Sequence, residues 1–380
     1  MPRPVNAVDF WRGFALITIF IDHIPGLFYA KYTLINFSLS DAADLFVFLA
    51  GWSLRLMAEG GGRKMPTRNV VLRLLGRALE LYAAQVLITM LAIAMLAITA
   101  TELNNPLLLQ WHNAAAVFND PVPTHIGLAI LTHQLGYFDI LPLYVVLMLM
   151  APLFAVIDRL APNLVLPASL VIYLCALAFR ITLPTWPVSG TWFFNPLAWQ
   201  MTFVLGFVFA REDAGPGAFV RRHIVWVRAL ALPILIYFTV AVLFDLLWDP
   251  TDVPEPELFF ILDKTWATPP RLIQFLSLVA VFSLVFPYIR RFGELPYVRT
   301  VGMPFIGMLA MLGRNSLYVF CVGSLLSLGG QMLRYYYHGS VASDTGVVIS
   351  GIIIMAFTAW LAESRQRSRP PSPAPSAQRS

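Results

Sequence analysis

The stretch VDFWRGFALITIFIDHIPG, residues 8–26, decides the fold, because its middle is apolar enough for a lipid bilayer while both ends are charged. Asp9 and Arg12 lie at one end, and Asp22 and His23 lie at the other. Residues eleven apart on an α-helix point in directions about 20° apart, so Arg12 and His23 share a face, roughly 16 Å apart along the axis. Ionisable groups in a membrane usually face a bundle interior or a water-filled cavity. We therefore expect a membrane helix with a functional group near each mouth.

Composition supports a membrane protein with many spans. The chain has 380 residues, of which 58% are hydrophobic and 12% charged, and its mean hydropathy is +0.71. These values predict an all-α polytopic fold of about ten transmembrane helices. The apolar segments lie at 10–29, 41–58, 70–99, 138–157, 164–182, 195–211, 226–247, 271–289, 310–329 and 343–362. We expect one membrane domain over residues 1–363, followed by a disordered Ser/Pro/Arg-rich tail over 364–380.

The distribution of basic residues predicts the orientation. With ten spans, five of the 26 Lys and Arg residues fall on one side, and they are Lys31, Arg180, Lys264, Arg271 and Arg334. Two more, Arg12 and Arg314, lie within spans, and the other 19 fall on the side of both termini. Because basic residues favour cytoplasmic loops, we expect both termini in the cytoplasm. The net charge of +5 reflects this loop bias, and no basic run interleaved with aromatics indicates a nucleic-acid partner.

The first span suits a reaction with one substrate from each side. Arg12 could hold an anionic group of a donor by paired hydrogen bonds. His23 could act as general base on a hydroxyl from outside, because its ordinary pKa lies near neutrality. Asp22 points about 100° away from His23, so an acid that orients the base should come from another helix. Asp41 and Asp44, at the outer end of the second span, are the candidates. The alternative is that these charges only anchor the helices.

Several segments in order resemble the OpgC family, a branch of the membrane acyltransferase 3 superfamily. They are DFWRGFALITIFIDHIPG, FSLSDAADLFVFLAGWS, GYFDILPLYVVLMLMAP, FFNPLAWQMTFVLG and LGRNSLYVF. The resemblance implies transfer of succinyl groups from cytoplasmic succinyl-CoA to hydroxyls of periplasmic glucans. By this likeness, His23 matches the catalytic histidine and Arg12 the arginine of the donor site. Asp41 and Asp44 match the acidic pair of the motif.

Further polar residues could contact either substrate. On the cytoplasmic side, Arg73, Arg77 and Arg314 could meet the coenzyme A phosphates, although ordinary anchoring would also place them there. On the outer side, we expect an acceptor sugar to contact a set of polar and aromatic side chains, namely Asp22, Asp139, Tyr144, Asn195, Trp199 and Gln200. Asp139 could equally cap a helix, and tryptophans at an interface can form a belt.

The sequence therefore predicts a membrane O-acyltransferase that uses acyl-CoA as donor and has no tightly bound cofactor. Its partners would be acyl-CoA, a glucan or other glycan acceptor, and membrane lipid. His112, His125 and His133 lack metal-ligand spacing, so we predict no metal site. Direct transfer and a covalent acyl intermediate both remain open. The alternative function is a transporter or flippase of an anionic lipid or sugar, which would use the same intramembrane charges.

Overall fold

The computed structural model describes residues 5–59, 65–292, 300 and 302–367. It is 77% helical, which confirms the predicted all-α class. The described strands are two short ones, β1 (Pro184–Thr185) and β2 (Gly190–Thr191). They pair antiparallel, with Pro184 opposite Thr191.

Six helical stretches in the described residues are long and apolar enough to cross a membrane. They are α3 (Thr67–Glu102), α6 (Ile140–Leu160), α10 (Ile224–Leu243), α11 (Pro269–Phe282) continued by α12 (Val285–Phe292), α14 (Ser316–Tyr336) and α15 (Val341–Arg367). Shorter apolar helices are α7 (Val165–Ala178), α8 (Pro196–Phe209) and α13 (Met303–Arg314). The chain is thus a membrane protein by its helices, and the figure of about ten spans stays a prediction.

The remaining helical elements include the two helices α1 and α2, around which the others pack, and shorter connecting helices. They are α1 (Ala7–Asp22), α2 (Ala42–Glu59), α4 (Ala115–Asn119), α5 (Pro121–Ala129) and α9 (Gly215–Arg222). Short 3₁₀ helices are η1 (Phe28–Tyr32), η2 (Leu34–Asn36), η4 (Pro106–Asn113), η5 (Pro162–Leu164), η6 (Pro250–Asp252) and η7 (Glu257–Phe259). The last helix, α15, continues to Arg367, so the start of the predicted tail is helical. The rest of that tail lies outside the described residues.

Two predicted spans differ from the helices observed. The segment 10–29 is helical only to Asp22, because Pro25 and Gly26 follow, and Gly26 takes the left-handed φ of +75°. The segment 310–329 straddles a break at Asn315, where φ and ψ are −105° and 32°. The Asn315 side chain donates to the carbonyl of Met311 at 2.9 Å. A side chain that bonds the preceding turn in this way competes with continued helix, so α13 and α14 are separate.

Glycines allow two helix pairs to pack backbone against backbone. Gly13 of α1 meets the Leu309 carbonyl of α13, and a Cβ added at Gly13 would lie 1.9 Å from that oxygen. Gly206 of α8 meets the Phe48 carbonyl of α2 in the same way. Small residues are common where membrane helices approach this closely. These contacts fix α1 on α13 and α2 on α8.

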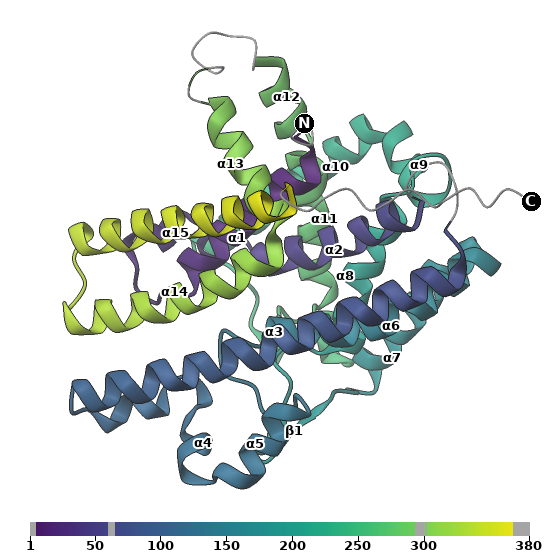
Figure 1. Ribbon diagram of the computed structural model, residues 1–380. Helices are drawn as coiled ribbons and strands as arrows, with labels where there is room; N and C mark the ends of the chain where they lie inside the picture. Colours follow the sequence, from purple (N-terminus) through teal and green to yellow (C-terminus); the bar gives the residue numbers. More distant parts are fainter. Residues whose placement is uncertain (1–4, 60–64, 293–299, 301, 368–380) are drawn as a thin grey trace, which may run out of the picture.

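The long helices lie alongside one another and form the frame around α1 and α2. In Figure 1, α3 runs beside α6, and α14 runs antiparallel to α15. α1 also packs on α2 and α14. A polar residue on α1 therefore faces α2, α13 or α14, which is where a membrane protein can place a buried charge.

The backbone contact at Gly206 gives a direct test of this packing. In a Gly206→Ala protein, the added Cβ would lie 1.9 Å from the Phe48 oxygen, so α2 and α8 must separate. We expect a loss of about 3 kcal/mol or more, the upper range for overpacked cores. Thermal unfolding in detergent measures it.

Gly346→Ala is the matched control, because no atom lies within 4 Å of its added Cβ. It should leave the stability unchanged or raise it by up to about 1 kcal/mol. Equal melting temperatures for the two variants would contradict the close contact of α2 with α8.

Candidate active site

One pocket surrounds Arg12 and is called here the Arg12 pocket. Its volume is about 430 Å³. The side chains that line it come from α1, α2, α3, α6 and α14, and they include Arg12, Phe46, Arg73, Arg77, Glu80, Leu141, Tyr144 and Phe320. The structure thus brings Arg73 and Arg77, two of the expected donor contacts, into one pocket with Arg12.

The Arg12 guanidinium has capacity for a ligand. Its Nη2 donates to the Leu49 carbonyl at 3.5 Å. Its Nε is buried without a hydrogen-bond partner among the described residues. Arg77 pairs with Glu80 at 2.7 Å, and both of these side chains are more than a third exposed. The pocket therefore has one partly buried cation, Arg12, and two more exposed cations, Arg73 and Arg77, an arrangement that suits an anionic ligand.

A second pocket surrounds the end of α1 and is called here the His23 pocket. Its volume is about 360 Å³, and the residues that line it include Ile19, Asp22, His23, Asp41, Tyr137, Asp139, Ile140, Phe194 and Lys264. Two of the predicted acceptor contacts, Asp22 and Asp139, thus lie beside His23.

His23 is held at the C-terminal end of α1 with its ring in this pocket. Its N–H still bonds the Ile19 carbonyl at 3.0 Å, and its own carbonyl accepts from Gln331 Nε2 at 2.6 Å. The ring contacts Tyr137, with centroids 4.8 Å apart. Its Nδ1 is buried without a hydrogen-bond partner in the described chain. The backbone is therefore fixed while a ring nitrogen stays available, as a base requires.

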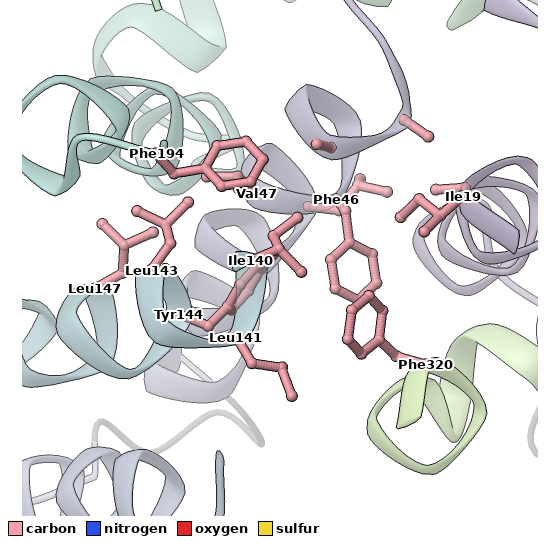
Figure 2. Packing of buried hydrophobic residues seen from close by; sticks show 14 of the residues in the cluster. Ile19, Phe46, Val47, Ile140, Leu141, Leu143, Tyr144, Leu147, Phe194 and Phe320 are labelled. Carbon is pink, nitrogen blue, oxygen red and sulfur yellow. The ribbon is translucent and has the colours of Figure 1, made fainter. Parts of the chain in front are cut away.

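The two pockets follow one another along the same helices, with aromatic rings between them. Ile140 lines the His23 pocket and its neighbour Leu141 lines the Arg12 pocket. The ring of Phe46 stacks on Phe320 at 6.2 Å and contacts Tyr144 at 5.4 Å. In Figure 2, the Phe46 and Phe320 rings lie in the space between α6 and the Ile19 side of α1. We call Phe46, Tyr144 and Phe320 the aromatic layer.

A buried cluster of charges joins α2 to the start of α11. Asp41 accepts from Lys264 Nζ at 2.5 Å, and Asp44 accepts from Arg271 at 2.5 Å. Arg271 also lies 3.4 Å from Asp41. Neither carboxylate has a hydrogen bond to His23 among the described residues. No direct contact therefore supports the role expected for Asp41 and Asp44, which was to orient the base. Their side chains instead pair with the cations Lys264 and Arg271.

Sequence reasoning missed Lys264 and Arg271. Lys264 lines the His23 pocket and lies over the Phe194 ring, 5.4 Å from its centroid. A signal was present, because both cations fall on the side where basic residues are rare. A cation on that side needs an acidic partner, and Asp41 and Asp44 were predicted on the same side, at the outer end of the second span.

Four other predicted residues lie elsewhere than expected. Tyr144 lines the Arg12 pocket instead of the outer one, because it lies one turn further along α6 than Ile140. Asn195, Trp199 and Gln200 are fully buried, and their polar groups bind the protein itself.

These three side chains bind neighbouring segments of the chain. Asn195 donates to the Ile181 carbonyl at 2.8 Å and caps α8. Trp199 Nε1 donates to the Lys264 carbonyl at 2.9 Å, which positions that residue in the His23 pocket. Gln200 binds Ser169. Their observed contacts are structural.

Arg314 lies outside the lining of the Arg12 pocket. Its Nε pairs with Glu363 of α15 at 2.8 Å, and both side chains are 16% exposed. In the described ranges, no three His, Cys, Asp or Glu side chains are grouped so that they could hold a metal ion.

The buried cluster predicts a large stability effect at Arg271. An Arg271→Met change would leave the buried Asp44 without its cation, and loss of one partner of a buried pair costs about 3–5 kcal/mol. Thermal unfolding in detergent is the measurement. Arg180→Met is the matched control, because the Arg180–Glu257 pair is 59% and 36% exposed and should contribute about 1 kcal/mol or less. An Arg271→Met protein as stable as the control would refute the role of the cluster.

A family model described as OpgC protein matches residues 4–367. No curated protein and no solved structure matches the chain. The family indicates a transferase with an OpgC-like role in glucan modification. Because the match includes both pockets and nearly the whole chain, the protein belongs to the OpgC family.

Proposed function

We propose that the protein is a membrane O-acyltransferase that moves an acyl group, succinyl by family likeness, from cytoplasmic acyl-CoA to a hydroxyl of a periplasmic glucan. The observation that carries the proposal is the pair of pockets along α1, one with Arg12 and the other with His23. Two substrates that approach from opposite sides need two such pockets. The proposal includes the inner membrane as location. It also includes cytoplasmic termini, and the distribution of basic residues supports this orientation.

The donor would enter the Arg12 pocket. Arg73 and Arg77 at the mouth would bind the phosphates of coenzyme A. The thioester arm is long and thin, so it could extend past Arg12 toward the aromatic layer. The apolar walls of α2 and α14 would exclude water from the thioester and limit its hydrolysis.

The acceptor would enter the His23 pocket. His23 would take the proton from a glucan hydroxyl, and the alkoxide would attack the thioester carbonyl carbon. The carbon–sulfur bond then breaks, and the leaving thiolate takes a proton to give free coenzyme A. A covalent acyl intermediate before this step is equally compatible with the geometry. Lys264, the cation in this pocket, would offset negative charge that develops on the carbonyl oxygen.

His23 gives the first test. We expect purified wild-type protein to transfer label from succinyl-CoA to periplasmic glucan, and His23→Ala to lose at least about a hundredfold in rate, the usual contribution of a general base. His125→Ala is the matched control, because His125 is exposed and bonds its own helix at Pro121. Equal transfer rates for His23→Ala and His125→Ala would show that His23 is not the general base. A folded wild type without transfer from any acyl-CoA would favour the transporter instead.

Arg77 tests the donor side separately. An Arg77→Gln protein loses one charge-assisted contact to a phosphate, so the KM for acyl-CoA should rise about tenfold with little change in kcat. Steady-state kinetics with varied donor measure this. Arg68→Gln is the control, because Arg68 is an exposed cation of the same helix outside the pocket lining. A donor KM that stays constant in Arg77→Gln, or rises equally in both, would contradict donor binding in the Arg12 pocket.

A further inference from the structure

A third pocket lies beside His23 and is called here the Trp111 pocket. Its volume is about 570 Å³, within the range of small-molecule sites. It is lined by two aromatic rings, Trp111 and Tyr335, and by the polar side chains of His112, Gln331, Arg334 and His338. No residue of η4 was predicted to bind a substrate.

Hydrogen bonds and ring contacts connect this pocket to His23. Gln331 Nε2 donates to the His23 carbonyl at 2.6 Å, and its Oε1 accepts from His112 at 2.7 Å. The Tyr137 ring lies between the two histidines, 4.8 Å from His23 and 5.2 Å from His112. A ligand in the Trp111 pocket would therefore lie one side chain away from the proposed base.

The two aromatic rings lie at an angle of 87° to each other and form a corner of the pocket. Trp111 and Tyr335 meet edge to face at 5.6 Å, and Asn105 donates to the Tyr335 hydroxyl at 2.5 Å. Tyr335 remains 45% exposed and Trp111 half-buried. A belt tryptophan needs only contact with the lipid interface, whereas Trp111 packs on polar pocket residues. Sugar rings offer apolar C–H faces that can lie on such rings, and hydroxyls that suit the neighbouring amide and imidazole.

The backbone here is held in an unusual conformation. His112 and Asn113 have φ values of 56° and 63°, and His338 has 56°. Left-handed φ at residues with a side chain is uncommon, and such strain clusters at ligand sites. It presents the Trp111 and His112 side chains toward α14. Burial also lowers the pKa of His112, and because its Nε2 donates to Gln331 Oε1, its Nδ1 is the nitrogen left to accept from a ligand.

Charge in this pocket favours a neutral ligand over an anion. The Arg334 guanidinium pairs with Asp344 at 2.9 Å and donates to the Pro25 carbonyl at 3.3 Å. It also packs against Gly26 and Gly339, where an added Cβ would lie 2.9 and 2.7 Å from it. Arg334 is thus committed to the wall of the pocket, and little positive charge is left for a phosphate or carboxylate.

We propose that the Trp111 pocket binds glucose rings of a neutral glucan and thereby positions a hydroxyl of the next sugar unit at His23. This rests on the proposed function for the identity of the acceptor. Trp111 and Tyr335 are the stacking residues, and Gln331 and His112 bond to hydroxyls. The pocket holds sugar units that do not react, so its contribution is to acceptor affinity.

Direct binding of a neutral glucose oligosaccharide, without any acyl donor, tests the site. We expect Trp111→Ala and Tyr335→Ala each to weaken binding to the purified protein roughly threefold to tenfold, the usual contribution of one aromatic contact. Trp111→Phe, which keeps a ring, should retain most of the affinity and guards against misfolding of the alanine variant. Tyr337→Ala is the matched control, because Tyr337 is 63% exposed and outside the pocket lining.

The same proteins in the transfer assay separate the two proposals. A higher glucan KM in Trp111→Ala with a nearly unchanged kcat is the expected result. Transfer by wild type with an unaltered glucan KM in both alanine variants would overturn the sugar site and leave the acyltransferase. Sugar binding that depends on Trp111 in a wild type without transfer would support the site and reject the acyltransferase. Displacement of the sugar by inorganic phosphate would contradict the proposal that the pocket binds a neutral ligand.

Discussion

The Asp44–Arg271 ion pair, with Asp41 and Lys264 beside it, is the contact on which both proposed substrate pockets depend. All four groups lie at the junction of α2 with α11, and the Arg271 and Asp44 side chains are 9% and 3% exposed. A charge left alone in such a place costs several kcal/mol, so neither helix can shift without losing its partner. The cluster therefore sets the position of α2, and with it the Phe46 ring. It also holds the Lys264 ammonium at the His23 pocket.

The same constraint explains the other basic residues of the predicted outer side. Of the five cations there, four have an acid as ion-pair partner: Arg180 with Glu257, Lys264 with Asp41, Arg271 with Asp44 and Arg334 with Asp344. The fifth, Lys31, lies over the Phe28 ring, 5.7 Å from its centroid. Cations on the side opposite to the basic loops are disfavoured unless something holds them. Here each of the four ion pairs joins two segments, and two of the cations, Lys264 and Arg334, line the His23 and Trp111 pockets.

The sequence predicted what depends on local pattern. The all-α class, the family and the placement of Asp22 and Asp139 beside His23 follow from apolar segments and from the order of motifs. Contacts between distant segments could not be read in this way. Gln200 looked available to a sugar, but Ser169, thirty-one positions away, already binds it. The break at Asn315 was missed although Arg314, Asn315 and Ser316 are polar, because the apolar residues on both sides of these three suggested one continuous span.

The position of α14 connects the two ends of the proposed reaction. Phe320 lies in the aromatic layer, and Gln331, eleven residues later, bonds the His23 carbonyl. Eleven residues bring a helix back to nearly the same face, so α14 repeats the spacing of Arg12 and His23 on α1. In the proposed reaction, a thioester arm that extended from the Arg12 pocket toward the His23 pocket would pass Phe46 and Phe320. A sugar bound at Gln331, as proposed, would contact the same helix that carries Phe320 at the Arg12 pocket.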